Sequence, residues 1–325
     1  MYLSIVIPIF NEEDSLPRLK TSLDQALQDF TQAWEVIFVD DGSEDRTPSI
    51  LEEIAVDDPE HVRVVLFRRN FGQTTAIAAG IDHASGEVIV LMDADLQNDP
   101  ADIPLMVAKL NEGFDVVSGW RKDRKDAFLT RTLPSRLANG LISWVTGVKL
   151  NDYGCTLKAY RREAITGFRL YGEMHRFIPV YAHSMGAKIV EMPVRHHPRR
   201  WGKAKYGLER TTKVILDLFT VKFLSAYTGK PGYLFGGIGG FFVLVSAILM
   251  TFLAVRRLAV GTEVLSSPFF LVAIVMLSFG FQSLLMGLIA ELLARTYHES
   301  QQKPTYTVRK RIGVEAPNHR GESGL

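Results

Sequence analysis

The stretch VIVLMDADLQ, residues 88–97, joins a run of five apolar residues to a pair of carboxylates. Val88–Met92 carries no charged side chain, which is typical of a strand buried on both faces of a sheet. Asp93 and Asp95 follow at once, so both acids are expected where this strand ends. Two carboxylates at the end of a buried strand repel each other and lose hydration unless a cation neutralises them.

Strand-like and helical segments alternate on both sides of this stretch. Short apolar runs predict strands at Leu3–Ile9, Val36–Asp40, Val62–Phe67, Val88–Met92 and Val116–Ser118. Apolar residues at helical spacing predict helices at Leu16–Leu27, Thr47–Val56, Thr74–Ala84 and Ile103–Leu110. This order predicts an α/β fold, a doubly wound Rossmann-like domain whose parallel sheet is covered on both faces.

Ligands of such sheets bind at the carboxyl ends of the strands, and three of the first four predicted strands have acids there. The first is followed by Phe10-Asn11-Glu12, the second ends in Asp40-Asp41-Gly42-Ser43, and the fourth precedes Asp93-Ala94-Asp95. The glycine fingerprint of dinucleotide-binding domains is absent, which argues against a dehydrogenase.

A divalent-metal site is the strongest chemical prediction. Carboxylate and amide oxygens suit Mg²⁺ or Mn²⁺, and these ions usually keep positions open for phosphate oxygens. Asp93 and Asp95 are the candidate ligands, and Gln97 is a candidate third ligand. An Asp-x-Asp pair often only starts a loop, but its place after a buried strand, with Asp40 and Asp41 at a neighbouring end, favours the metal.

Two basic stretches are candidates for binding phosphate. Arg121, Arg124 and Arg131 follow the fifth predicted strand, and residues 199–205 (RRWGKAK) form a second basic run. A solvated basic surface is the alternative for each, although guanidinium groups bind phosphate with paired hydrogen bonds. Since Lys and Arg total 37 against 36 Asp and Glu, the net charge of +1 does not indicate a nucleic-acid partner.

Two long uncharged runs predict membrane spans. Gly232–Val255 and Pro268–Ala290 are 24 and 23 residues long, and about 20 apolar residues cross a bilayer as a helix. The short connector predicts an antiparallel hairpin. The excess of Lys and Arg before the first span and after the second places the large N-terminal part and the tail in the cytoplasm.

The chain is therefore expected to have four parts: a catalytic domain (1–205), an amphipathic helix in the membrane interface (206–231), two spans (232–294) and a basic cytoplasmic tail (295–325). A helix packed on the soluble domain is the alternative for 206–231. The stretch after Gln302 is expected to be poorly ordered. The N-terminus, MYLSIVIPIF, is too short for a signal peptide, and Cys155 is the single cysteine, so no intramolecular disulfide can form.

These motifs, in this order and spacing, resemble the family 2 glycosyltransferases of the GT-A fold. They are most similar to the polyprenyl-phosphate glycosyltransferases, which include dolichol-phosphate mannose synthase and the bactoprenol glucosyltransferases. The further motifs that carry the resemblance are residues 69–72 (RNFG), 151–155 (NDYGC) and 197–202 (HPRRWG). Two residues depart from the pattern: Gln73 stands where Lys is frequent, and Ala204 where Ser is common, so each removes one phosphate contact.

The resemblance implies a role for each candidate residue. The nucleoside would be held by Pro8, Phe10, Glu12, Asp40, Asp41 and Asp93. The metal and the diphosphate would be bound by Asp93, Asp95 and Gln97, and phosphates by Arg121, Arg131, Arg200 and Lys205. Asp152 would lie near the acceptor, either as a base or as a group that orients the acceptor or the sugar, and the catalytic set would be Asp152, Asp95 and Arg200.

The implied activity is inverting, metal-dependent transfer of one sugar to polyprenyl (undecaprenyl) phosphate. A β-glucosyltransferase that uses UDP-glucose is expected, as a multi-pass inner-membrane protein and a homo-oligomer, a tetramer by resemblance. GDP-mannose and a UDP-linked modified pentose are alternative donors. The alternative functions are a processive polysaccharide synthase, a sugar nucleotidyltransferase and an inactive membrane anchor subunit. Too few spans and the lack of Gln in the HPRRW stretch argue against the synthase. The chain lacks the Gly-rich loop expected of a sugar nucleotidyltransferase, and its intact acidic site argues against an inactive anchor subunit.

Overall fold

The computed structural model describes residues 1–122, 139–140, 142–144, 146–166, 170, 174–198, 231–261, 263–265, 267–300 and 306–314. The chain divides into two compact units, and each is described by itself. The first unit comprises Met1–Val221 together with Pro304–Leu325, and the second comprises Lys222–Lys303.

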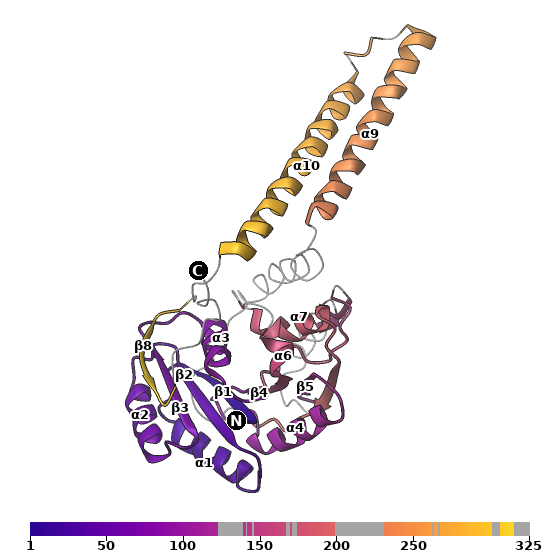
Figure 1. The fold of residues 1–325 in the computed structure, drawn as a ribbon. Helices are drawn as coiled ribbons and strands as arrows, with labels where there is room; N and C mark the ends of the chain where they lie inside the picture. Colours follow the sequence, from indigo (N-terminus) through magenta and orange to yellow (C-terminus); the bar gives the residue numbers. More distant parts are fainter. Residues whose placement is uncertain are drawn as a thin grey trace, which may run out of the picture. The chain divides into compact units, whose positions relative to one another are not determined.

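The strands of the described residues form one eight-stranded sheet in the order β7-β5-β6-β4-β1-β2-β3-β8 (Figure 1). The strands are β1 Leu3–Ile9, β2 Trp34–Asp40, β3 Val62–Phe67, β4 Val88–Leu91, β5 Val116–Trp120, β6 Lys158–Arg161, β7 Ile189–Pro193 and β8 Val308–Ile312. The α-helices of this unit are α1 Leu16–Leu27, α2 Thr47–Asp57, α3 Gln73–His83, α4 Ile103–Asn111, α6 Arg162–Ile165 and α7 Ile178–Ser184. The 3₁₀ helices are η1 Pro100–Asp102 and η3 Met174–Phe177.

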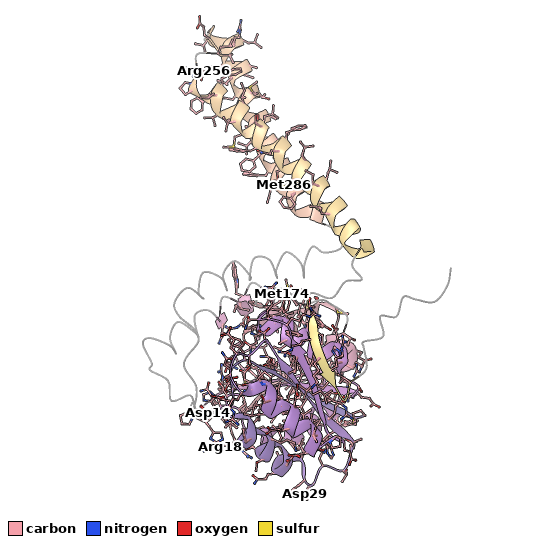
Figure 2. The ribbon with its side chains drawn as sticks, turned by 90° about the vertical axis from the view of Figure 1, so that its left-hand side faces the viewer. Asp14, Arg18, Asp29, Met174, Arg256 and Met286 are labelled. Atoms are coloured by element: carbon pink, nitrogen blue, oxygen red, sulfur yellow. The ribbon has the colours of Figure 1, made fainter. Side chains whose placement is uncertain are left out.

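Helices cover the two faces of the sheet, because the inner strands are apolar on both sides. Helices α1, α2 and α4 pack on one face, where Leu19 and Leu23 of α1 join Ile5 and Ile7 of β1 in the core. Helix α3 covers the other face (Figure 1). The start of α1 lies at the surface of the unit, where Figure 2 labels Asp14 and Arg18.

The expected strands and helices of the first 120 residues are confirmed, with boundaries that differ by at most two residues. The expected parallel arrangement is confirmed for the five predicted strands, but the whole sheet is mixed, because β6 pairs antiparallel with β4 and β5, and β8 pairs antiparallel with β3. Strand β6 has only four residues (KAYR), and β8 has three consecutive basic residues between two apolar ones (VRKRI), so neither shows the apolar run of an inner strand. The expected disorder after Gln302 is wrong for Val308–Ile312.

The second unit is a helical hairpin of α9 (Pro231–Val260) and α10 (Pro268–Ser300), both longer than the predicted spans. The helices are antiparallel: Ser246 Oγ donates to the Ala273 carbonyl (2.7 Å), and Ser283 Oγ donates to the Phe235 carbonyl (3.0 Å). Figure 2 shows side chains around both helices, with Arg256 near the end of α9.

The hairpin is apolar on its outer surface. Its windows Phe235–Val260 and Pro268–Ile289 have mean hydropathies of 2.5 and 2.2, and only 17% and 11% of them are buried. The core helix of a soluble protein would be mostly buried, so both helices are candidate membrane spans by length, composition and exposure. Residues 206–230, expected to form the interfacial helix, lie outside the described residues.

Candidate functional site

The predicted acids gather at one edge of the sheet. Strand β1 lies between β2 and β4 and is parallel to both, so the carboxyl ends of all three strands meet there. Phe10 follows β1, Asp40 ends β2, and Asp93 lies two residues after β4. This is the edge where ligands bind in open α/β sheets.

A cavity of about 260 Å³ opens at the ends of β1, β2 and β3. Its lining residues are Phe10, Asp40, Gly42, Ser43, Glu44, Pro48, Leu66, Phe67, Arg68, Arg69, Asn70 and Arg309. Of the residues expected to hold the nucleoside, Phe10 and Asp40 line this cavity. Pro8, Glu12 and Asp41 are not among the described residues that line it; Pro8 is buried within β1.

The adjacent acids Asp40 and Asp41 have different surroundings. Asp41 accepts hydrogen bonds from the backbone N–H groups of Phe71 (2.7 Å) and Gly72 (2.9 Å), so it holds the loop that begins α3. Asp40 lines the cavity and accepts from the backbone N–H of Ser43 (3.2 Å). Burial raises the pKa of Asp40, and burial raises the pKa of Asp41 to about 6 although the two backbone hydrogen bonds oppose it.

Glu12 also makes contacts within the protein. Ser15 Oγ donates to Glu12 Oε2 (2.8 Å), and the Glu12 backbone N–H donates to Thr47 Oγ1 (2.9 Å). The Asn11 backbone N–H similarly donates to Ser43 Oγ (2.8 Å). These hydrogen bonds join the loop after β1 to the loop after β2, and so shape the rim beside the cavity.

Replacing Gly42 with alanine should destabilise the unit and close this cavity. Gly42 has a φ of +72°, and an added Cβ would lie 2.3 Å from the Arg69 carbonyl carbon. We expect the free energy of unfolding to fall by about 2 kcal/mol or more, because the left-handed conformation costs about 1–2 kcal/mol for alanine and the backbone contact adds to that cost. Thermal unfolding measures the loss. Gly113→Ala is the matched control, since Gly113 also has a positive φ (+103°) but nothing within 4 Å. Equal losses in the two variants would show that the backbone contact is unimportant.

Asp93 is held by two side chains that the sequence did not predict. Gln73 Nε2 donates to Asp93 Oδ1 (2.8 Å), and Thr156 Oγ1 donates to Asp93 Oδ2 (2.7 Å). The residue at position 73 was expected only to remove a phosphate contact, whereas the structure shows it orienting the first acid of the pair. Asp95 Oδ1 accepts from the backbone N–H of Gln97 (3.1 Å), which orders the turn between them.

The donor set fits a hard divalent cation. Asp93, Asp95 and Gln97 are half-buried, and they offer carboxylate and amide oxygens. Two carboxylates and an amide suit Mg²⁺ or Mn²⁺, which proteins often bind through one or two carboxylates while substrate phosphates complete the coordination.

Metal affinity should fall as the pH is lowered. Burial and the nearby Asp95 carboxylate raise the pKa of Asp93, so Asp93 takes up a proton at mildly acidic pH, where an ordinary aspartate is still ionised. A metal needs the ionised form, so protons compete with it, and affinity should drop about tenfold per pH unit below that pKa. Mn²⁺ titrations in the presence of UDP at pH 7.5 and 5.5 measure this. Asp93→Asn is the control, and an equally steep dependence in that variant would assign the effect to another group.

Arg121 and Asp152 form a buried ion pair. Arg121 Nε donates to Asp152 Oδ2 (2.7 Å) and Arg121 Nη2 donates to Oδ1 (2.9 Å), so both carboxylate oxygens accept from one guanidinium. Burial alone would lower the pKa of Arg121, but the hydrogen bonds and charge of Asp152 outweigh it and raise that pKa. The charge of Arg121 also opposes the rise in the pKa of Asp93, so the ion pair acts electrostatically on the candidate metal site.

The segment that leads into the second basic run is attached beside the acid pair. The His197 backbone N–H donates to the Gln97 carbonyl (2.8 Å), and His197 Nε2 lies 3.2 Å from Asp99 Oδ2. The Arg195 backbone N–H donates to Asp102 Oδ2 (2.7 Å). The predicted phosphate-binding residues Arg131, Arg200 and Lys205 lie outside the described residues.

Comparisons with known proteins identify a family model and similar sequences. The family model described as Glycosyl transferase family 2 matches residues 4–168. A dodecaprenyl-phosphate galacturonate synthase of Rhizobium johnstonii is 43% identical over 311 residues, covering 95% of this chain and 92% of the relative. An undecaprenyl-phosphate 4-deoxy-4-formamido-L-arabinose transferase of Proteus mirabilis is 36% identical over 320 residues, covering 98% and 96%.

The fold is also found among solved structures. Glucosyl-3-phosphoglycerate synthase from Mycobacterium tuberculosis, in complex with Mn²⁺, UDP and glucosyl-3-phosphoglycerate, matches with a TM-score of 0.51 and 19% identity. The match covers 69% of this chain and 79% of that chain. The predicted GT-A-like α/β fold is thereby confirmed.

Proposed function

Because the chain belongs to glycosyl transferase family 2, we propose that it transfers a single sugar from a nucleotide sugar to a polyprenyl phosphate. The observation that carries the proposal is the acid pair Asp93 and Asp95 on the same sheet edge as a cavity lined by Phe10 and Asp40. Polyprenyl-phosphate sugar transfer is also the activity in the names of the two relatives, which align over nearly the whole chain.

The donor would lie across this edge, with its nucleoside in the cavity and its diphosphate towards Asp95. Asp93, Asp95 and Gln97 would hold Mg²⁺ or Mn²⁺, which when bound neutralises charge on the departing diphosphate. Gln73 and Thr156 fix the orientation of the Asp93 carboxylate, so that it is preorganised for this task.

The acceptor reduces the need for a general base. A phosphate monoester has a second pKa of about 6, so it is largely dianionic near pH 7 and can attack the sugar without first losing a proton. Asp152 was expected as a candidate base, but both of its oxygens accept from Arg121. We assign it instead to positioning Arg121, whose charge acts on Asp93. Attack opposite the departing diphosphate would invert the sugar carbon.

The second basic run would bind the phosphates of donor and acceptor. His197 is attached to Gln97, so the residues that follow it begin at the edge where the diphosphate would lie. Arg200 and Lys205 are the proposed phosphate contacts from this run, and Arg131 is the proposed contact from the segment after β5.

The sugars named in the two relatives differ from the glucose that was expected. The expectation of glucose from UDP-glucose came from resemblance to the bactoprenol glucosyltransferases. The two relatives instead carry galacturonate and 4-deoxy-4-formamido-L-arabinose in their names. A donor screen should therefore include UDP-glucose, UDP-galacturonate, a UDP-linked formamido-pentose and GDP-mannose.

Helices α9 and α10 would anchor the enzyme in the inner membrane, where a polyprenyl phosphate keeps its tail. We propose a multi-pass hairpin with the sheet-containing unit on the cytoplasmic side, as the distribution of Lys and Arg indicates. The tetramer implied by resemblance remains a prediction, and the mass of the detergent-solubilised protein tests it.

The test is a product assay with the full chain in detergent, a labelled donor from the screen, and undecaprenyl phosphate. We expect a lipid that carries one labelled sugar and forms only when both the lipid and a divalent metal are present. A labelled polymer would indicate a processive synthase, and label in a new nucleotide sugar would indicate a nucleotidyltransferase. Failure to form any product from all four donors would contradict the proposal.

A further inference from the structure

One wall of the cavity comes from the far end of the chain. Arg309 of β8 lines the cavity together with Arg68 and Arg69, which follow β3. Strand β8 pairs with β3, so a residue more than 200 positions away in sequence is brought beside the end of β2. The family match ends at residue 168 and does not include this strand.

The register of β8 places Arg309 in an unusual position. Leu66 is paired with Lys310 but Phe67 is paired with Val308, so one step along β3 corresponds to two steps along β8. Arg309 is the extra residue and has no partner opposite it on β3. Such β-bulges redirect a side chain and are frequent next to functional sites.

The strand around Arg309 is attached on both sides. The Tyr306 ring stacks on Phe67 with centroids 5.2 Å apart, and its hydroxyl donates to Asp82 Oδ2 (3.1 Å). Arg311 Nε donates to His83 Nε2 (3.2 Å) on the other side. The flanking residues thus anchor the strand.

Arg309 differs from its basic neighbours on β8. Lys310 is paired with Glu52 (2.9 Å) and Arg311 with His83. Among the described residues, no hydrogen bond or ion pair engages the exposed Arg309 guanidinium. The anchored strand thus presents to the cavity a guanidinium that has no partner within the part of the chain that the structure describes.

We propose that Arg309 is a donor-binding residue that contacts the base of the nucleotide sugar. This inference rests on the proposed function, because it assumes that the cavity holds the nucleoside. Asp40 can accept from an imino N–H, and a guanidinium can only donate, so the two together match an imino N–H beside a carbonyl oxygen. Uracil presents that pair. Guanine presents the same pair. In cytosine and adenine an acceptor nitrogen takes the place of the imino N–H and an amino group takes the place of the carbonyl, so a base in the same pose would face Asp40 with an acceptor and Arg309 with a donor.

Binding of UMP and UDP to the full chain in detergent tests the proposal by calorimetry, with Mn²⁺ present. Arg309→Ala should weaken the binding of both nucleotides by a similar factor, about tenfold, as expected for loss of a hydrogen bond from a charged group. Arg309→Gln keeps an amide donor, so its nucleotide affinity should fall less. CMP should bind the wild-type chain more weakly, and Arg309→Ala should narrow the difference between UMP and CMP.

Lys310→Ala is the matched control, because it removes the same charge from the next residue of β8, which does not line the cavity. It should leave nucleotide affinity unchanged, and thermal unfolding of all variants reports whether β8 stays in place. Unchanged UMP affinity in Arg309→Ala would overturn the inference while leaving the proposed function intact. A loss much larger for UDP than for UMP would also overturn it, since it would indicate a phosphate contact. Failure of the wild-type chain to bind either nucleotide would overturn the inference, and the donor screen, which includes GDP-mannose, would then decide the proposed function separately.

Discussion

Replacing Asp95 with alanine is expected to reduce sugar transfer about 10²–10³-fold. Removing one preorganised group that stabilises developing charge has an effect of that size, and Asp95 is the acid proposed to hold the metal against the diphosphate. The same variant should lose the metal dependence of donor binding. Calorimetric titration of UDP with and without Mn²⁺ measures this directly: the wild-type chain should bind UDP more tightly with the metal, and the variant should not.

The control for this experiment is Asp24→Asn. Asp24 is an exposed carboxylate on α1 that pairs with Lys20, away from the strand ends. Its loss removes one negative charge but should leave transfer and Mn²⁺-dependent UDP binding unchanged. If Asp95→Ala kept the wild-type affinity for UDP in the presence of Mn²⁺, the assignment of the metal to this acid pair would be wrong.

Replacing Asp152 with asparagine should lower both stability and activity. The change removes one partner of a buried, doubly hydrogen-bonded ion pair and leaves the Arg121 charge uncompensated. Breaking such pairs costs about 3–5 kcal/mol, which for a domain of this size lowers the unfolding midpoint by roughly 10 °C. Thermal unfolding and the rate of sugar transfer are the two measurements. Near-wild-type turnover would remove Asp152 from the mechanism.

The double variant Asp152→Asn with Arg121→Gln separates structure from chemistry. It removes both charges, so no buried charge is left unpaired and most of the lost stability should return. Activity should stay low, because the cation that acts on Asp93 is gone. If the double variant regained activity along with stability, the ion pair would have only a structural role. A base role for Asp152 predicts instead a rate that rises with pH until the base has lost its proton.

The sequence was sufficient to predict where the first strands and helices lie. Apolar runs such as Val88–Met92 must be buried whatever their neighbours are, and helical spacing of leucines in Leu16–Leu27 creates one apolar face. The location of Asp93 and Asp95 at a ligand-binding edge followed from the same local patterns. Local hydrophobic periodicity therefore determined the layers of the catalytic unit and the edge that carries the site.

The task of each acid depended on contacts between residues far apart in sequence. Asp40 and Asp41 are adjacent, yet one faces the cavity and the other holds the loop of residues 71–72, because the chain turns where β2 ends. Asp152 meets Arg121 across 31 residues.

The position of β8 was decided only by the tertiary structure. Its short basic pattern has no strand signal of its own, and it becomes a strand only by pairing with the exposed edge of β3. Side-chain roles and edge strands depend on such long-range pairing, whereas burial is already encoded in the local order of apolar and polar residues.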